Sequence, residues 1–138
     1  MSPQDDTRKA LIPERRSFSA HSTIFKEGDP ADCAYIVESG EVEITKTVNG
    51  RRITLGTLHG WEMFGELALI DDQPRMATAT AIDDSVCMVV SKTSVAQMMD
   101  DAPQGLNTVI HSLAQIVRKA GQDLAEARYQ LLEQENPG

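Results

Sequence analysis

The segment from Phe64 to Ala81, FGELALIDDQPRMATATA, holds the residues whose types and spacing are best suited to chemistry. Glu66 follows Gly65 where a short helix is expected to start, and Arg75 lies nine residues after Glu66. A carboxylate accepts hydrogen bonds from a hydroxyl, whereas a guanidinium offers paired donors to the oxygens of a phosphate. Backbone N–H groups at a helix start also favour an anion. The pattern therefore predicts a site for a ligand that carries both a hydroxyl and a phosphate.

The other residues of this segment are mostly small or apolar. Gly65 allows a close approach of the backbone, and the next residues can present N–H groups without competing polar side chains. We expect Glu66 to lie near Arg75 and to offset the cost of sheltering its charge. The candidate ligand-binding residues are Phe64, Gly65, Glu66, Leu67, Ala68, Pro74, Arg75, Met76, Ala77 and Thr78.

Short strands must position this segment. Runs of apolar and β-branched residues alternate with Gly, Pro, Asp and Asn, and Asn49-Gly50 is a strong signal for a two-residue hairpin turn. Many short strands at this spacing predict an antiparallel jelly-roll β-barrel rather than alternating strands and helices. The expected strands are 22–25, 34–37, 42–48, 52–58, 78–82 and 85–90.

The last third of the chain predicts helices. Residues 91–100 form a short helical pattern, and a long one runs from Gln104 to about Glu133. Its apolar residues recur at alternating spacings of four and three, which is a heptad seam and favours a homodimer of parallel helices. We expect the first half to touch the barrel and the second half to meet the partner. Gly121 is either a hinge or an exposed position at which the glycine has no particular role. The seam comprises Leu106, Ile110, Leu113, Val117, Ala120, Leu124, Ala127 and Leu131.

The chain thus divides into three parts. An N-terminal arm or short helix covers residues 1–17, with the helix expected near 7–12. A β-barrel covers 18–90 and contains the segment 64–81. C-terminal helices cover 91–138, with the heptad seam at 106–131.

Bulk properties narrow the function. The 138 residues suit one domain, and the net charge of −8 argues against broad binding to nucleic acids or anionic membranes. No apolar run is long enough to span a bilayer. Cys33 and Cys87 do not make a disulfide framework, which favours the cytoplasm. The three histidines are scattered, so no metal site or cofactor is expected.

The segment 64–81 resembles the phosphate-binding cassette of cyclic-nucleotide-binding domains, the modules of bacterial catabolite activators, protein kinase A regulatory subunits and gated channels. Residues 24–29, IFKEGD, and 34–42, AYIVESGEV, resemble the family's early strand, glycine turn and next hairpin. The resemblance covers roughly residues 18–131. It implies that Glu66 holds the ribose 2′-hydroxyl and Arg75 the cyclic phosphate. Gly65, Ala77 and Thr78 also fall on cassette positions.

Two residues depart from the family's pattern. Met76 stands where the family usually has Ala, Ser or Thr, and it lacks the hydroxyl that the family associates with the guanine amino group, so cAMP is the expected ligand rather than cGMP. Trp61 stands where the family usually has Gly, and it would be strained if that position needs a positive φ. Otherwise the loop differs, or Trp61 packs beside the pocket. Candidate contacts to the base are Gln115, Arg118 and Gln122.

These features predict a regulatory sensor, not an enzyme, that couples nucleotide binding to movement of its long helix. One alternative keeps the fold as a dimer scaffold that has lost nucleotide binding. A cupin-type enzyme would need clustered histidines, and only His59 lies in a strand-like segment near the centre. A transcription factor would need a helix-turn-helix after the seam, and the acidic chain ends at Gly138, so no direct DNA binding is expected. Whether these residues are a whole protein or a piece of one stays open.

Overall fold

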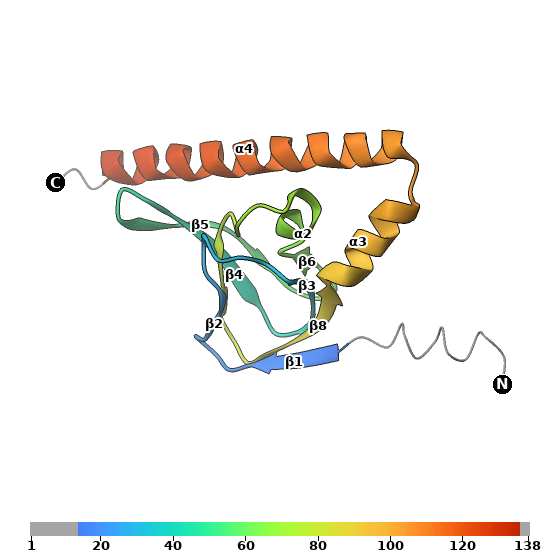
Figure 1. Ribbon diagram of the computed structural model, residues 1–138. Coiled ribbons are helices and arrows are strands. Elements are labelled where there is room, and N and C mark those ends of the chain that lie inside the picture. Colours follow the sequence, from blue (N-terminus) through green and yellow to red (C-terminus); the bar gives the residue numbers. More distant parts are fainter. Residues whose placement is uncertain (1–13, 136–138) are drawn as a thin grey trace.

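The computed structural model of the protein describes residues 14–135, in which two antiparallel β-sheets lie beneath one long helix (Figure 1). The helix expected near residues 7–12 lies outside the described residues. The strands are β1 Glu14–Phe18, β2 Thr23–Phe25, β3 Cys33–Ser39, β4 Val42–Val48, β5 Arg51–Leu58, β6 Met63–Phe64, β7 Thr78–Ala81 and β8 Ser85–Ser91. The helices are α2 Leu67–Asp71, α3 Lys92–Asp101 and α4 Gln104–Glu135.

The strands form two four-stranded sheets, ordered β1-β8-β3-β6 and β2-β7-β4-β5, and every pairing is antiparallel. The predicted class, mainly β with C-terminal helices in a jelly-roll arrangement, is confirmed. In the part of the chain that the structure describes, however, the strands form a sandwich-like pair of sheets rather than one closed barrel. Asn49 and Gly50 form the predicted turn between β4 and β5, with φ angles of 51° and 79°.

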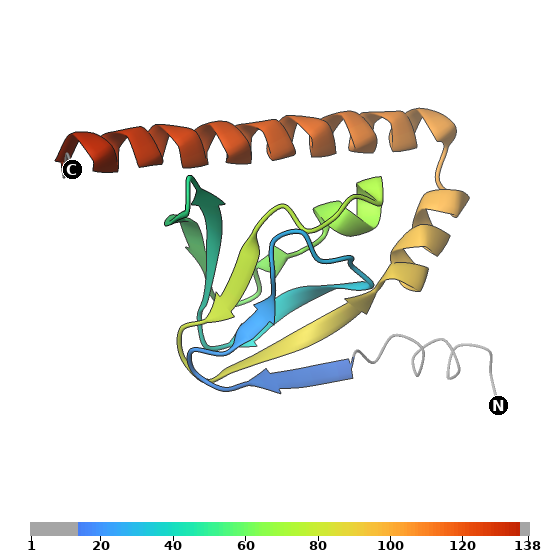
Figure 2. The same ribbon diagram turned by 60° about the vertical axis from the view of Figure 1, so that its left-hand side comes forward.

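The core is built by buried residues of the strands, and Cys33, Ala34 and Tyr35 of β3 are buried in succession. Val37 on β3 and Val42 on β4 are fully buried, and so is Cys87 on β8. The Tyr35 ring stacks on Phe64, with ring centroids 5.3 Å apart. Burial raises the pKa of the Cys87 thiol to about 11, because a thiolate is poorly solvated there. This core holds the two sheets together below the end that faces α4 (Figure 2).

The first strand lies partly in the region predicted to be an arm or short helix. β1 pairs with β8 at the edge of its sheet. Its sequence, ERRSF, is exposed over four of its five residues, so it lacks the alternation that marks a half-buried strand. Pairing with β8, rather than its own pattern, therefore makes this segment a strand.

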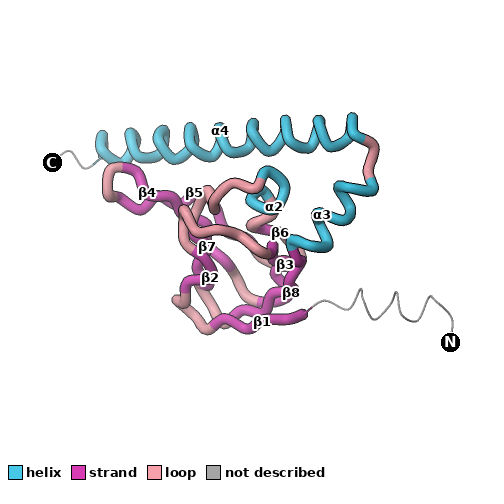
Figure 3. Tube along the Cα trace, in the orientation of Figure 1, coloured by secondary structure: helices cyan, strands magenta, loops and turns pink. Residues whose placement is uncertain are grey.

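Helix α4 runs over the end of the sandwich and contacts α2, β4 and β5, as the ribbon in two orientations and the tube trace show (Figures 1, 2 and 3). Its inner face uses small residues: Ala114 and Ala125 are buried, at 2% and 0% exposed. Arg128 anchors its second half by donating to the Thr54 carbonyl of β5. Small side chains let the helix lie close to the sheets. No helix among the described residues is both long and apolar enough to cross a membrane.

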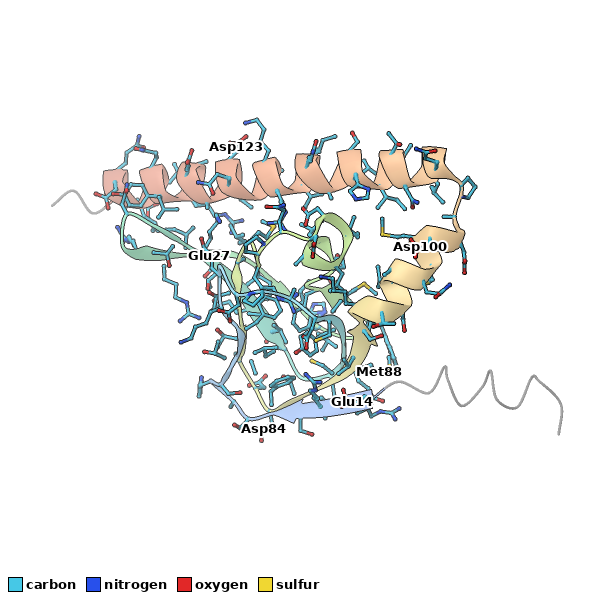
Figure 4. All side chains as sticks on the ribbon, viewed as in Figure 1. Glu14, Glu27, Asp84, Met88, Asp100 and Asp123 are labelled. Atoms are coloured by element: carbon cyan, nitrogen blue, oxygen red, sulfur yellow. The ribbon has the colours of Figure 1, made fainter. Side chains whose placement is uncertain are left out.

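Most residues of the heptad seam are exposed on α4. In its first half, Leu106 and Leu113 are exposed, whereas Ile110 is half-buried and Val117 lines a cavity, so the expectation that this half touches the barrel holds only in part. Asp123 marks the outer face in Figure 4, where it points away from the sheets. The exposed large apolar residues of the helix are Leu106, Val109, Leu113, Ile116, Val117, Leu124 and Leu131.

Candidate functional site

A cavity of about 230 Å³ lies where the two sheets meet α2 and α4. Its wall is mostly apolar, and its charged side chains are one carboxylate and one guanidinium. Such a composition is typical of a small-molecule site, in which a few polar groups orient the ligand. The lining residues are Phe25, Ile44, Met63, Phe64, Gly65, Glu66, Leu67, Ala68, Arg75, Met76, Ala77 and Val117.

Arg75 is the dominant charge of this cavity and is only 5% exposed. Its Nη1 donates to the Gly65 carbonyl at 2.7 Å, and its Nη2 donates to the Cys33 carbonyl at 2.6 Å. The guanidinium carbon lies 4.0 Å from the centroid of the Phe25 ring. Nε is buried and has no hydrogen-bond partner. Carbonyl dipoles and a ring face orient the guanidinium, but they do not neutralise it.

No carboxylate in the described chain forms an ion pair with Arg75. A buried charge without a counter-charge is costly, because neither water nor an opposite charge offsets the loss of hydration. An anion in the cavity would supply that counter-charge and an acceptor for Nε. The geometry therefore fits a ligand with a negatively charged, oxygen-rich group.

The backbone of Arg75 is held by the turn between β2 and β3. The Arg75 N–H donates to the Asp29 carbonyl at 2.9 Å, and the Gly28 N–H donates to the Arg75 carbonyl at 2.8 Å. The turn itself is closed by the Lys26 N–H, which donates to Asp29 Oδ2 at 3.1 Å. Since Phe25 directly precedes this turn, the same element sets the guanidinium and the ring beneath it.

Gly65 cannot carry a side chain here. Its φ is +82°, and a Cβ atom added to it would lie 2.5 Å from Arg75 Nη1 and 3.2 Å from the Phe25 ring. The left-handed backbone alone disfavours other residues. The close approach that the sequence predicted for Gly65 is thus an approach to the arginine, which uses the Gly65 carbonyl as its acceptor.

Glu66 lines the cavity at the start of α2, and its side chain makes no capping hydrogen bond. Its carbonyl accepts the first helical bonds, from Leu69 and Ile70. The first N–H groups of a helix lack intrahelical partners, and here they belong to the cavity-lining Leu67 and the residue after it. α2 therefore offers an acceptor carboxylate and backbone donors on one side of the cavity.

The expected contact between Glu66 and Arg75 is not made. No hydrogen bond or ion pair joins the two in the described residues, because both terminal nitrogens of the arginine are directed at backbone carbonyls. Glu66 thus does not neutralise Arg75. The carboxylate and the guanidinium instead form two separate polar points on the cavity wall, as a ligand with a hydroxyl and a phosphate would require.

Pro74 and Thr78 are the two predicted residues that do not line the cavity. Pro74 is exposed and borders a shallow groove with Gly28 and Lys92. The Thr78 hydroxyl accepts a hydrogen bond from the Glu27 N–H at 2.9 Å. Thr78 lines a different, open groove on the sheet. These positions favour structural roles for both residues.

Met76 joins the cavity to the helix above it. Its carbonyl accepts from Lys46 Nζ at 2.8 Å, and Lys46 also pairs with Glu27 at 3.1 Å. Figure 4 labels Glu27, which lies in the turn between β2 and β3. The Met76 side chain lines the cavity and ends against Gly121 of α4. Gly121 is half-buried beneath this side chain, so it is not an exposed position.

Four lining residues were missed by the reasoning from sequence. Phe25 and Ile44 come from strands far from the cassette, and Met63 directly precedes it. Val117 belongs to the heptad seam and was assigned to a dimer interface. It lines the cavity and is nevertheless 47% exposed. An arginine expected to be buried could have pointed to an aromatic partner such as Phe25.

The three candidate contacts to a base do not line the cavity. Arg118 forms a bidentate ion pair with Asp71 on α2, with Nη2 2.9 Å from Oδ1 and Nε bonded to Oδ2. Burial alone would raise the Asp71 pKa, but the hydrogen bonds from Arg118 and the Gln73 backbone, with the guanidinium charge, hold that pKa below its usual value. Gln115 borders another groove, and Gln122 donates to Glu126 on the same helix.

Trp61 does adopt a positive φ, the conformation that was expected to strain a tryptophan at this position. Its φ is 68°, and its N–H donates to the Val37 carbonyl at 2.6 Å. The side chain is 67% exposed and is not part of the cavity wall. Trp61 is thus held in a conformation that favours glycine, in the segment that leads into the cavity. In residues 14–135, moreover, no group of three or more His, Cys, Asp or Glu side chains is placed to hold a metal ion.

A two-sheet jelly roll, a short helix at a buried arginine and a long covering helix together define a small-molecule-binding β-domain. A family model described as cyclic nucleotide-binding domain matches residues 15–102. The chain belongs to this family, which confirms the resemblance of the segment 64–81.

Three proteins illustrate the similarity. The CRP-like cAMP-activated global transcriptional regulator of Mycobacterium tuberculosis is 32% identical over 110 residues, 79% of this chain and 49% of that protein. The cAMP-dependent protein kinase regulatory subunit of Aspergillus niger is 38% identical over 84 residues, 61% of this chain and 20% of that protein. The EAL enzyme Bd1971 in its cAMP-bound form superposes with a TM-score of 0.77 at 33% identity, covering 88% of this chain and 32% of that one.

The comparisons leave two finer predictions open. The same EAL enzyme in its cGMP-bound form matches with a TM-score of 0.74 at 35% identity, so the likeness does not separate the two nucleotides. This chain spans about half the length of the M. tuberculosis relative. That relative is named a transcriptional regulator, so the comparisons do not support the expectation that this chain makes no direct contact with DNA.

Proposed function

We propose that this chain is a cyclic-nucleotide sensor, with cAMP as its preferred ligand, and that it reports binding through α4. The observation that carries the proposal is Arg75: a guanidinium 5% exposed, without a carboxylate partner in the described chain, on the wall of a mostly apolar cavity. A cyclic phosphate supplies one negative charge and oxygen acceptors for this group. The proposal describes a binding module without catalysis.

Three features of the cavity match three parts of the ligand. Arg75 and the N–H groups at the start of α2 face the phosphate. Glu66 accepts a hydrogen bond from the ribose 2′-hydroxyl. The apolar wall, which includes Val117 of α4, receives the flat base. Since Glu66 and Arg75 are not bonded to each other, each keeps its hydrogen-bonding capacity for the ligand.

The preference for cAMP rests on Met76. Its thioether lines the cavity at the position where the family's Ser or Thr hydroxyl is associated with the guanine amino group. Met76 offers no hydroxyl, so a guanine amino group would be sheltered without a partner, which costs binding free energy.

The coupling to α4 rests on its contacts with both sides of the cavity. Val117 forms part of the wall, and Arg118 ties α4 to Asp71 at the end of α2. A ligand shifts a conformational equilibrium only by its differential affinity for the two states. Because wall and helix share residues, filling the cavity changes the packing of α4 directly. Hydrogen exchange of the α4 amides, with and without saturating cAMP, tests this coupling. Identical exchange would contradict it.

Calorimetric titration of the purified chain with cAMP, and in parallel with cGMP, tests the binding itself. We expect one site per chain and tighter binding of cAMP. Binding that favours cGMP would overturn the role given to Met76. No heat and no shift in melting temperature with either nucleotide would instead favour the second candidate, a dimer scaffold that has lost the ligand, which the bulky Met76 and the strained Trp61 support.

We also infer that the chain forms a homodimer through the outer face of α4. The seam residues Leu106, Leu113 and Leu131 are 49%, 55% and 58% exposed, which is unusual for large apolar side chains that follow one another along a helix. Their heptad spacing suits a parallel partner helix. Cys33 and Cys87 are free and buried thiols, which suits the cytoplasm as the location of the protein.

Leu124→Glu tests the dimer, because a carboxylate at the centre of the seam would be buried without a partner. Sedimentation should show the mass of two chains for the parent and of one chain for the variant. Gln122→Glu, on the same turn of α4 but outside the seam, is the matched control and should leave the mass unchanged. An equal mass for the parent and Leu124→Glu would remove the seam as the interface.

A further inference from the structure

Gly121 lies in the middle of α4 directly above the cavity, where a glycine is unfavourable for the helix itself. An isolated glycine inside a helix usually has a packing or functional reason. Here the reason is visible: a Cβ atom added to Gly121 would lie 2.3 Å from Met76 Cε and 3.8 Å from Met76 Sδ. The end of the Met76 side chain occupies the space that any other residue at 121 would fill.

The other glycine of the same helix shows that this contact is particular to position 121. An added Cβ at Gly105 would meet no atom within 4 Å. Gly105 can therefore accept a side chain, whereas Gly121 cannot unless Met76 moves.

The Met76 backbone is fixed, so a rearrangement would be confined to its flexible side chain. The Met76 carbonyl accepts from Lys46, and its neighbours Arg75 and Ala77 are buried in the cavity wall. The side chain lines the cavity on one side and reaches Gly121 on the other. If the space over Gly121 were closed, the flexible thioether would turn back into the cavity.

The cavity has little room for it. Its volume is about 230 Å³, and pockets that bind drug-sized ligands measure roughly 300–1,000 Å³. A methionine side chain turned inward would therefore compete directly with a ligand. A longer or branched residue at 121 would have the same effect by a larger displacement.

We propose that Gly121 is a positioning residue for the nucleotide site: its missing side chain leaves a recess in α4 that holds the Met76 thioether clear of the ligand. This inference rests on the proposed function. It adds that the ligand-binding volume is set by a pair of residues 45 positions apart in the chain, one on the cassette and one on the helix.

The experiment is a double-mutant cycle read by calorimetry with cAMP. Gly121→Ala should weaken binding at least tenfold, because the new methyl group drives Met76 into the cavity. In a Met76→Ala background, which has its own affinity, adding Gly121→Ala should change the dissociation constant less than twofold. Gly105→Ala is the matched control on the same helix and should leave the affinity of the parent unchanged.

The outcomes separate this inference from the function on which it rests. If the parent binds neither cAMP nor cGMP, the proposed function fails and the role of Gly121 falls with it. If the parent binds and Gly121→Ala changes the affinity less than twofold, or by the same factor in both backgrounds, only the recess is wrong. Should Gly121→Ala not fold, Met76→Ile replaces it: the branched, shorter side chain cannot reach the recess, and it should weaken binding at least fivefold while α4 is untouched.

Discussion

Two sheltered arginines flank helix α2, and their charges are treated in opposite ways. Arg118 comes from α4, and both oxygens of the Asp71 carboxylate accept its hydrogen bonds. Arg75 comes from the cassette, and only two backbone carbonyls accept from it while Nε lacks a partner. A paired charge holds two helices together. Arg75 is 5% exposed, and a neutral donor could make its two hydrogen bonds to backbone carbonyls equally well. Its charge is therefore best explained by a ligand.

A second unfavourable feature on the cavity side of the molecule is a strained backbone conformation. Trp61, with a φ of 68°, precedes the strand whose residues Met63 and Phe64 line the cavity. Asp72, next to the paired Asp71, also has a positive φ of 55°, but it is the C-cap of α2, and aspartate tolerates the left-handed conformation better than tryptophan does. Unsatisfied charge and backbone strain tend to collect at functional sites, whereas structural contacts are satisfied within the fold.

The largest effect is expected from Arg75→Ala. Loss of the guanidinium removes the counter-charge of the phosphate, and the affinity for cAMP should fall by about 2 kcal/mol or more, roughly 30-fold. Calorimetry measures it. Arg52→Ala, which removes an exposed arginine paired with Glu43 away from the cavity, is the control and should bind as the parent does. An unchanged dissociation constant for Arg75→Ala would remove Arg75 from the site and end the contrast with Arg118.

Asp71→Asn addresses the paired arginine. It leaves Arg118 facing a neutral amide, so the free energy of unfolding in urea at pH 7 should fall by about 1–3 kcal/mol. The sheltered position of this pair, with the Asp71 side chain 10% exposed, makes it stronger than a surface ion pair.

The same variant predicts a pH dependence. Because the folded protein lowers the Asp71 pKa from its usual 3.8, the stabilisation is complete well above that value and is lost as the pH falls through the lower, folded-state pKa. The stability gap between the parent and Asp71→Asn should therefore narrow as the pH falls below about 4. A gap that is constant from pH 7 to pH 3 would mean that the carboxylate charge contributes nothing.

Much of the fold followed from local pattern. The residues of β4 alternate between apolar and polar in sequence over residues 42–45, and Asn49-Gly50 tolerates the positive φ of its turn, so both the strand and the turn were predicted. β1 was not, because an edge strand made of exposed residues has no alternation to detect. For α4 the apolar seam was clear, but the face that packs on the sheets is made of small residues such as Ala114 and Gly121, which carry a weak hydrophobic signal.

The candidate site was predictable where it is contiguous. The cassette brings Gly65, Glu66 and Arg75 together on the cavity wall. Phe25 and Val117 were missed because they reach the cavity from distant segments, and only the tertiary fold brings them there. The pairing of Glu66 with Arg75 was predicted wrongly, since sequence spacing gives proximity but not the direction of a guanidinium that can choose backbone carbonyls instead.

A smaller effect is expected from Trp61→Gly, which tests the strain on the cavity side. A left-handed backbone costs a side-chain-bearing residue about 1–2 kcal/mol, and glycine relieves it at some loss of conformational entropy. The exposed indole adds little packing to oppose this gain. The free energy of unfolding should rise by about 1 kcal/mol in urea denaturation. Trp61→Ala, which keeps the Cβ, is the control and should gain much less. Equal stability of all three proteins would show that the turn stores no strain.

An effect on stability of similar size, but almost none on the ligand, is expected from Thr78→Val, a cassette residue that the structure places outside the cavity. Its hydroxyl accepts from the Glu27 N–H at 2.9 Å, so the isosteric change should lower the free energy of unfolding by about 1 kcal/mol. The affinity for cAMP should stay within twofold of the parent, in contrast to Arg75→Ala, although both residues belong to the same short segment. A tenfold loss of affinity without loss of stability would instead place the Thr78 hydroxyl on the ligand. The boundary between the ligand-binding and structural halves of the cassette would then lie beyond Thr78 rather than at Ala77.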